Sequence, residues 1–183
     1  MTVNTEQLQQ IYAKADCLFT LREVENALDQ IVDPIARDLG NKNPVVLGVM
    51  NGSLATLGYL LPRLEFLLEI DYVHATRYQG DFHGKQLLWK RKPEVLLKGR
   101  HVLLVDDLLD QGITLKAIME DCVSQGALSV SIAVLGTKKI KGHNASIKAT
   151  YSALDIPDRY VFGFGMDYQN YWRNAPGIFA FKE

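Results

Sequence analysis

Short runs of aliphatic residues alternate along the chain with segments of helical pattern. Continuous aliphatic runs are typical of strands buried on both faces, and the helical segments between them can serve as the crossovers of a parallel sheet. The predicted strands cover residues 44–49, 66–78, 101–105 and 129–136. This alternation predicts an α/β fold in which a mostly parallel central sheet is flanked by helices.

The predicted helix over residues 20–40 has the clearest boundaries. Thr20 and Glu23 have the spacing of a capping box, and Gly40 can end the helix. The apolar positions that share one helical face are Val24, Leu28 and Ile31. Pro34 lies inside this helix, so we expect either a kink or a break there.

The two ends of the chain do not continue the alternation. A short helix can form over residues 5–16, and the tail is rich in aromatic residues and glycine. We expect residues 1–20 and 151–183 to form a small hood over one edge of the sheet, around a core at about 40–150, so that all 183 residues make a single domain. The polar segment 77–99 has no helical period, which predicts a loop with a hairpin.

Composition excludes several classes of protein. The net charge of −1 argues against non-specific nucleic-acid binding, which requires a basic surface. Cys17 and Cys122 lack the spacing of a zinc site or a disulfide framework. The first residues are polar, unlike a signal peptide, and the apolar stretches are too short to span a bilayer. We therefore expect a cytoplasmic protein with no membrane or nucleic-acid partner.

Three carboxylates follow the aliphatic run 101–105. Asp106 and Asp107 come directly after it and Asp110 follows three positions later. In open α/β sheets, ligands bind beyond the carboxyl ends of the strands. Gly112 lets the backbone curl into the next helix, so residues 110–114 can present N–H groups and the Thr114 hydroxyl to an anion.

Carboxylates beside an anion site need a second partner, because they repel a phosphate. A metal ion or the hydroxyls of a sugar would meet this need, since ionised carboxylates only accept hydrogen bonds. A sugar phosphate satisfies both parts, with Asp110 left between them as a base. Two other interpretations are a solvated acid pair with Asp110 as a helix cap, and a magnesium site of an NTPase. The chain lacks the GxxxxGK[ST] motif of the latter.

The segment "VLLVDDLLDQGITL" (102–115) resembles the 5-phosphoribosyl-1-pyrophosphate (PRPP) motif of type I phosphoribosyltransferases. "VMNGS" (49–53) resembles their pyrophosphate loop, and "TRYQGD" (76–81) resembles the start of their flexible catalytic loop. "LGTKK" (135–139) and "IPDRYVFGFGMDYQNYWRN" (156–174) are similar to the purine-recognition end of hypoxanthine-guanine phosphoribosyltransferases. The resemblance therefore implies the type I phosphoribosyltransferase fold, with a hood, and an activity in purine salvage.

The resemblance implies a reaction in which a purine base and PRPP give a nucleotide and pyrophosphate, with Mg²⁺ as cofactor. It assigns Asp106 and Asp107 to the ribose hydroxyls, directly or through the metal, and Asp110 to the purine as the catalytic base. The residues implied to bind the ribose 5′-phosphate are Gln111, Gly112, Ile113 and Thr114. The residues implied to form the pyrophosphate loop are Met50, Asn51 and Gly52, with a cis peptide bond between the first two.

The resemblance also implies how the base is bound. Lys138 would donate to the 6-oxo group, Tyr160 would stack on the ring, and the backbone of Val161 would contact its edge. An ammonium group only donates, so we expect hypoxanthine and guanine to be accepted and adenine to be refused. Asp167 would bind Mg²⁺, and Arg173 would reach the pyrophosphate.

Three positions depart from the family pattern. Asn51 stands where a basic residue is usual, and Gln111 replaces a common threonine. Arg77 precedes Tyr78, the tyrosine of the loop that closes over the reacting centre, where serine is usual. Arg77 is a candidate for the missing cation.

Three alternative functions stay open. The enzyme could prefer xanthine, the chain could be a nucleotide-sensing RNA-binding regulator, or it could have kept the fold without the activity. Relatives of this kind form dimers or tetramers, so a homodimer or homotetramer is expected.

Overall fold

The computed structural model describes residues 4–77, 87–140 and 145–182. Over these ranges the main sheet has six strands in the order β4-β3-β2-β5-β6-β7. Their bounds are β2 Val45–Val49, β3 Glu69–Arg77, β4 Leu87–Arg91, β5 His101–Leu109, β6 Ser129–Lys139 and β7 Tyr151–Pro157. All neighbours are parallel except β3 and β4, which form an antiparallel pair. The prediction of a mostly parallel sheet flanked by helices is confirmed.

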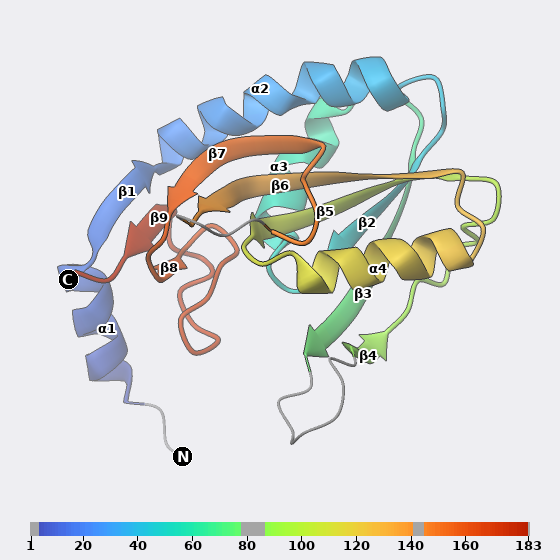
Figure 1. The fold of residues 1–183 in the computed structure, drawn as a ribbon. Coiled ribbons are helices and arrows are strands. Elements are labelled where there is room, and N and C mark those ends of the chain that lie inside the picture. Colours follow the sequence, from blue (N-terminus) through green and yellow to red (C-terminus); the bar gives the residue numbers. More distant parts are fainter. Residues whose placement is uncertain (1–3, 78–86, 141–144, 183) are drawn as a thin grey trace.

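Helices cover both faces of this sheet (Figure 1). Helix α2 (Leu21–Leu39) and helix α3 (Leu54–Leu60), which is followed by the 3₁₀ turn Leu61–Arg63, pack on one face. Helix α4 (Ile113–Ser124) packs on the other. The capping box of α2 is present, and its apolar stripe is buried as predicted. Pro34 lies within the helix without breaking it.

Two strands differ from the prediction. β5 continues past its aliphatic run through Asp106 and Asp107 to Leu109, because its neighbour β6 is also longer than expected and pairs with it up to Thr137. β7 was not predicted, since the segment before it carries no helical pattern to signal a crossover. Residues 151–157 pair with β6 at the edge of the main sheet and do not belong to the hood.

The two ends of the chain form a second, three-stranded sheet in the order β1-β9-β8. Its strands are β1 Asp16–Thr20, β8 Val161–Phe162 and β9 Gly177–Ala180, and helix α1 spans Thr5–Lys14. Tyr12 of α1 stacks on Trp172 with ring centroids 4.6 Å apart, and the Trp172 Nε1–H donates to the Leu8 carbonyl at 2.9 Å. Aromatic packing therefore joins the N-terminal helix to the tail, as expected for a hood. None of the described helices is long and apolar enough to cross a membrane.

Candidate active site

A cavity of about 260 Å³ lies beyond the carboxyl ends of β2, β3 and β5. It is lined by Val49, Met50, Asn51, Gly52, Ala75, Asp106, Asp107, Leu108, Asp110, Gln111, Gly112, Thr114, Leu115, Asp167 and Arg173. Three segments that are distant in sequence thus meet in one place: the turn after β2, the acidic end of β5 with the start of α4, and the C-terminal tail. Ala75 was not predicted, because a small residue in a strand carries no chemical signal.

The acid pair at the end of β5 is partly buried. Asp106 Oδ1 accepts from the Asp107 N–H at 2.9 Å, and Asp107 Oδ1 accepts from the Leu108 N–H at 2.6 Å. Burial raises the pKa of Asp106 well above its ordinary value, and the neighbouring charge of Asp107 raises it further. Burial also raises the pKa of Asp107. The positive charge of Arg173 opposes both pKa shifts, because it stabilises the ionised carboxylates. A ligand that donates hydrogen bonds to the pair would stabilise the ionised form in the same way.

Asp110 and the start of α4 line the cavity. Asp110 Oδ1 is buried and has no hydrogen-bond partner among the described residues. Buried acceptors are rarely left unpaired, so this atom is a candidate for contact with a ligand. Gly112, the N-cap of α4, has φ 74° and no side chain to cap the helix. The positive end of the helix dipole therefore faces the cavity and favours an anion there.

Residues after the β6 strand support this turn from outside. The Ser146 N–H and hydroxyl both donate to the Gln111 carbonyl, at 2.9 and 3.0 Å. A Cβ on Gly112 would lie 2.8 Å from the Ile147 side chain. The carbonyl of Gln111 is thus held away from the cavity, which leaves the amide side of the turn for an anion.

The turn after β2 lies directly against the acid pair. The Met50–Asn51 peptide bond is cis, as the resemblance implied. A Cβ on Gly52 would lie 2.1 Å from Asp107 Oδ2, so a larger residue at this position would have to displace the Asp107 carboxylate.

The C-terminal tail supplies a cation to the lining of the cavity. Arg173 Nη2 lies 2.6 Å from Asp167 Oδ1, and Arg173 Nη1 donates to the Gly165 carbonyl at 2.6 Å. Asp167 Oδ2 accepts from the Asn170 N–H at 2.7 Å. The two side chains predicted for Mg²⁺ and pyrophosphate are therefore paired with each other at the cavity.

Comparison with known proteins identifies the family. A family model described as a phosphoribosyl transferase domain matches residues 15–170. The chain belongs to the phosphoribosyltransferase family. A hypoxanthine-guanine phosphoribosyltransferase of Streptococcus pneumoniae is 32% identical over 163 residues, which cover 88% of this chain and 89% of that protein. The hypoxanthine-guanine-xanthine phosphoribosyltransferase of Tritrichomonas foetus is 27% identical over 91% of each chain.

A solved structure shows the same fold. The crystal structure of a hypoxanthine phosphoribosyltransferase from Staphylococcus aureus matches with a TM-score of 0.86 at 28% identity, over 93% of this chain and 94% of that one. The type I phosphoribosyltransferase fold predicted from the sequence is therefore confirmed.

The residues predicted to bind the purine do not line the cavity of this phosphoribosyltransferase. Lys138 is 14% exposed, lies 3.6 Å from Asp158, and lines a separate cavity of about 500 Å³ beside Leu109. Tyr160 is 55% exposed, and its hydroxyl donates to the Asp167 carbonyl at 3.2 Å. Val161 is buried in β8. Tyr160 thus connects the predicted purine end to the tail that carries Arg173.

The remaining predicted residues have other positions. Ile113 is the first residue of α4 but does not line the cavity. Arg77 ends β3, although its side chain and the whole of Tyr78 lie outside the described residues.

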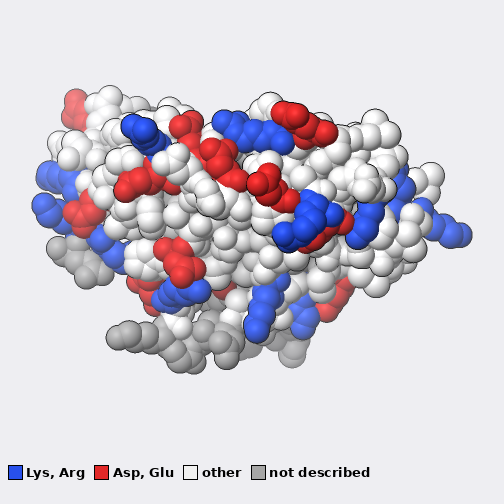
Figure 2. All heavy atoms as spheres, turned by 90° about the horizontal axis from the view of Figure 1, so that it is seen from above, with Lys and Arg blue, Asp and Glu red and all other residues white. Residues whose placement is uncertain are grey.

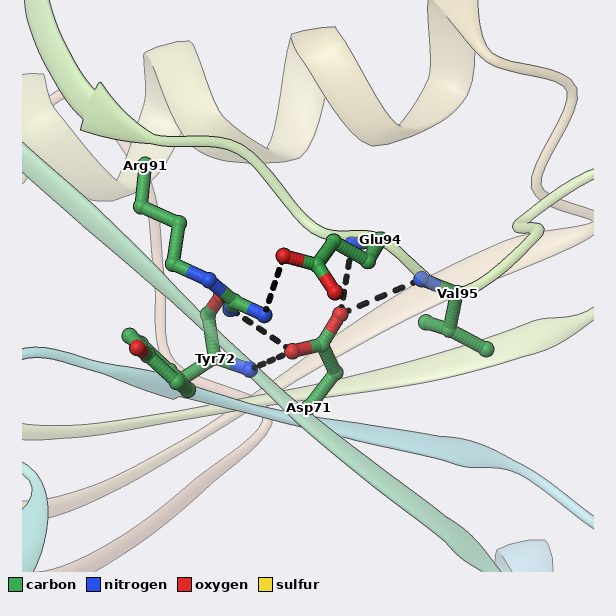
Figure 3. A network of polar contacts seen from close by, with 5 residues as sticks. All are labelled: Asp71, Tyr72, Arg91, Glu94 and Val95. Carbon is green, nitrogen blue, oxygen red and sulfur yellow. Dashed lines mark hydrogen bonds and ion pairs between the residues drawn. The ribbon is translucent and has the colours of Figure 1, made fainter.

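Sequence reasoning missed a polar network at the base of the β3–β4 hairpin (Figure 3). Asp71 Oδ1 accepts from the Tyr72 N–H and from Arg91 Nη1, both at 2.7 Å. Asp71 Oδ2 accepts from the N–H groups of Glu94 and Val95 at 2.6 and 3.1 Å. The guanidinium also lies over the Tyr72 ring, 3.7 Å from its centroid. The Asp71 carboxylate therefore holds the end of β4 and the segment that follows it against β3, the strand that contains Ala75.

We expect Asp71→Asn to destabilise the fold by about 1–3 kcal/mol at neutral pH, because one acceptor becomes a donor facing N–H groups. Burial raises the pKa of Asp71, but hydrogen bonds from Arg91 and three backbone amides outweigh it, and the net pKa is lowered. A lowered folded-state pKa gives stability that is present above the unfolded-state pKa and is lost as the pH falls through the folded-state pKa. Urea unfolding from neutral to acidic pH should therefore show weaker pH dependence in the variant.

Glu94→Gln is the matched control for Asp71→Asn. Glu94 is 82% exposed and pairs with the same Arg91 at 3.2 Å, so its loss should change stability by less than about 0.5 kcal/mol. Equal effects of the two substitutions would contradict the importance of the buried carboxylate.

Proposed function

We propose that this phosphoribosyltransferase acts in purine salvage and transfers the 5-phosphoribosyl group of PRPP to hypoxanthine or guanine, giving IMP or GMP and pyrophosphate. One observation carries the proposal. A single cavity combines an acid pair, an uncapped helix N-terminus and an arginine, which match the ribose hydroxyls, the 5′-phosphate and the pyrophosphate of PRPP. The names of the curated relatives support the choice of bases.

The proposed binding mode places PRPP across the three walls. The ribose hydroxyls donate to Asp106 and Asp107, and the 5′-phosphate accepts from the turn at residues 111–114. The pyrophosphate lies between the loop at residues 50–52 and Arg173. Arg173 lies beside the cavity in its pair with Asp167, so binding of pyrophosphate requires it to share or exchange that partner.

The proposed chemistry is displacement of pyrophosphate at the anomeric carbon by a purine ring nitrogen. Cleavage of such a bond proceeds through a transition state with oxocarbenium character, by analogy with glycoside hydrolysis. Asp106 and Asp107 place negative charge near the ribose, which stabilises the developing positive charge. Asp110, whose buried Oδ1 has no partner in the part of the chain described, accepts the proton from the purine.

Mg²⁺ is the proposed cofactor. The described residues contain no cluster of three or more acidic, histidine or cysteine side chains that could hold a metal ion. Mg²⁺ is commonly bound through one or two carboxylates together with substrate phosphates, and the Asp106–Asp107 pair fits this mode. Asp167 fits less directly, since both of its oxygens already accept from Arg173 and Asn170. When bound, the metal neutralises charge on the leaving pyrophosphate.

We expect hypoxanthine and guanine to react and adenine to be refused. Lys138 is largely buried, and its ammonium group can donate to a 6-oxo group but not accept from a 6-amino group. Lys138→Met should lower kcat/KM for hypoxanthine by about 10–100-fold, the value of a lost charge-assisted hydrogen bond. The test is a spectrophotometric assay with Mg²⁺, PRPP and hypoxanthine, guanine, xanthine or adenine in turn.

Lys139→Met is the control for this prediction. Lys139 is the next residue of β6 and lines the same cavity, but its side chain is 61% exposed and pairs with Asp155 at 3.0 Å. Its loss should therefore lower kcat/KM by less than about threefold. Adenine as the best substrate, or equal losses in the two variants, would overturn the assignment of Lys138.

The alternatives of the sequence analysis differ in their support. The name of the Tritrichomonas foetus relative includes xanthine, so xanthine belongs in the assay. An RNA-binding regulator needs a basic surface, whereas the face in Figure 2 interleaves lysine and arginine with aspartate and glutamate. The homo-oligomeric state and the cytoplasmic location stay predictions.

A further inference from the structure

Two backbone segments meet at the cavity without an intervening side chain, and the carboxylate of Asp107 lies directly against one of them. A Cβ on Gly165 would lie 2.1 Å from the Gly52 carbonyl oxygen, and a Cβ on Gly52 would lie 2.1 Å from Asp107 Oδ2. Both distances are well below any real van der Waals contact. The tail at Gly165 and the turn at Gly52 are therefore stacked as closely as main chain permits, and the Asp107 carboxylate packs against Gly52 as well.

The tail around Gly165 is braced to the two side chains that face the cavity. The Gly165 N–H donates to the Arg173 carbonyl at 2.8 Å, and Arg173 Nη1 donates back to the Gly165 carbonyl at 2.6 Å. Arg173 Nη2 in turn pairs with Asp167. A shift of Gly165 would therefore carry both Arg173 and Asp167 with it.

We propose that Gly165 is a positioning residue for the pyrophosphate end of PRPP, because its contact with Gly52 sets the gap between Arg173 and the pyrophosphate loop. The inference rests on the proposed function, since it takes that gap to hold pyrophosphate. Its φ of 104° and its missing side chain are both needed for the contact, so any other residue must displace either the tail or the loop.

The effect should be larger for PRPP and pyrophosphate than for the purine. The Gly52–Gly165 contact lies between the loop at residues 50–52 and the tail, whereas Lys138 belongs to β6 and lines the other cavity. Displacement of the tail should therefore weaken binding of PRPP and pyrophosphate more than binding of the purine. A general loss of folding would instead reduce all activities together.

The test compares Gly165→Ala with Gly177→Ala. Gly177 has φ 134° and a Cβ there would lie 2.5 Å from the Phe19 carbonyl, so the control has a similar backbone strain but lies in the hood, away from Gly52. In Gly165→Ala we expect KM for PRPP, and KM for pyrophosphate in the reverse reaction, to rise about tenfold or more. KM for hypoxanthine should change by less than about threefold, and Gly177→Ala should lose thermal stability without this split.

Gly58→Ala gives the baseline, because a Cβ at this position in α3 meets nothing within 4 Å. If Gly165→Ala does not fold, Ala55→Val is the deciding variant. The Ala55 Cβ lies 3.8 Å from the position that a Cβ on Gly165 would take, so a larger side chain on α3 would press on the Gly52–Gly165 contact. An unchanged KM for PRPP in the folded variant overturns the inference. A wild-type protein that uses PRPP with none of the bases overturns the proposed function instead.

Discussion

Asp110→Asn is expected to lower kcat by about 10²–10⁴-fold, the usual contribution of a general base. The substitution keeps the shape of the side chain but removes its ability to accept a proton. Asp110 lines the cavity, and its buried Oδ1 has no partner among the described residues, so the loss of charge breaks no hydrogen bond of the fold there. Steady-state kinetics with hypoxanthine give kcat, and calorimetry with PRPP gives the affinity.

The affinity for PRPP shows whether Asp110 acts as a general base or as a residue that binds PRPP. If Asp110 acts on the purine, the dissociation constant of PRPP should change by less than about threefold while kcat falls. Asp33→Asn is the control, because Asp33 lies on α2, away from the cavity. A variant with full kcat would remove Asp110 from the role of base, and one with weak PRPP binding would assign it to the substrate phosphate instead.

The site residues whose position was predictable from the sequence are those that lie in one contiguous segment; their roles stay predictions. The run from Asp106 to Thr114 combines a strand end, a glycine at the helix start and three acids within one short segment. Local rules place such a segment at the carboxyl edge of a sheet, and the structure has it there. The boundary of β5 was less predictable, because pairing with β6 carries a strand through residues that have low strand propensity of their own.

The contacts between distant segments could not be derived from local pattern. Gly52 and Gly165 are small residues in separate turns, and only the fold brings them together. The Asp71 network likewise joins β3 to the segment after β4. The resemblance to a family supplied the roles of Asp167 and Arg173, but not the ion pair between them.

Asp106→Asn is expected to stabilise the ligand-free protein while weakening PRPP binding by about 10–100-fold. Burial and the charge of Asp107 raise the pKa of Asp106 above its unfolded-state value. A raised folded-state pKa means that the ionised carboxylate disfavours the fold, so stability rises as the pH falls through the folded-state pKa toward the unfolded-state pKa. Asparagine removes this cost and still offers Oδ1 to the Asp107 N–H.

The sign of the stability change distinguishes the binding site from the framework. At neutral pH, Tm of Asp106→Asn should exceed that of the wild type, by about 2–4 °C for each kcal/mol gained, and the difference should shrink in acid. Asp71→Asn is the opposite case, because the pKa of Asp71 is lowered and its carboxylate stabilises the fold. A group that serves binding is expected to destabilise the fold when the cavity is empty and to gain hydrogen bonds when ribose is bound. Asp106 fits this description. A lower Tm for Asp106→Asn, with unchanged PRPP affinity, would place Asp106 in the framework and leave the cavity without its proposed ribose site.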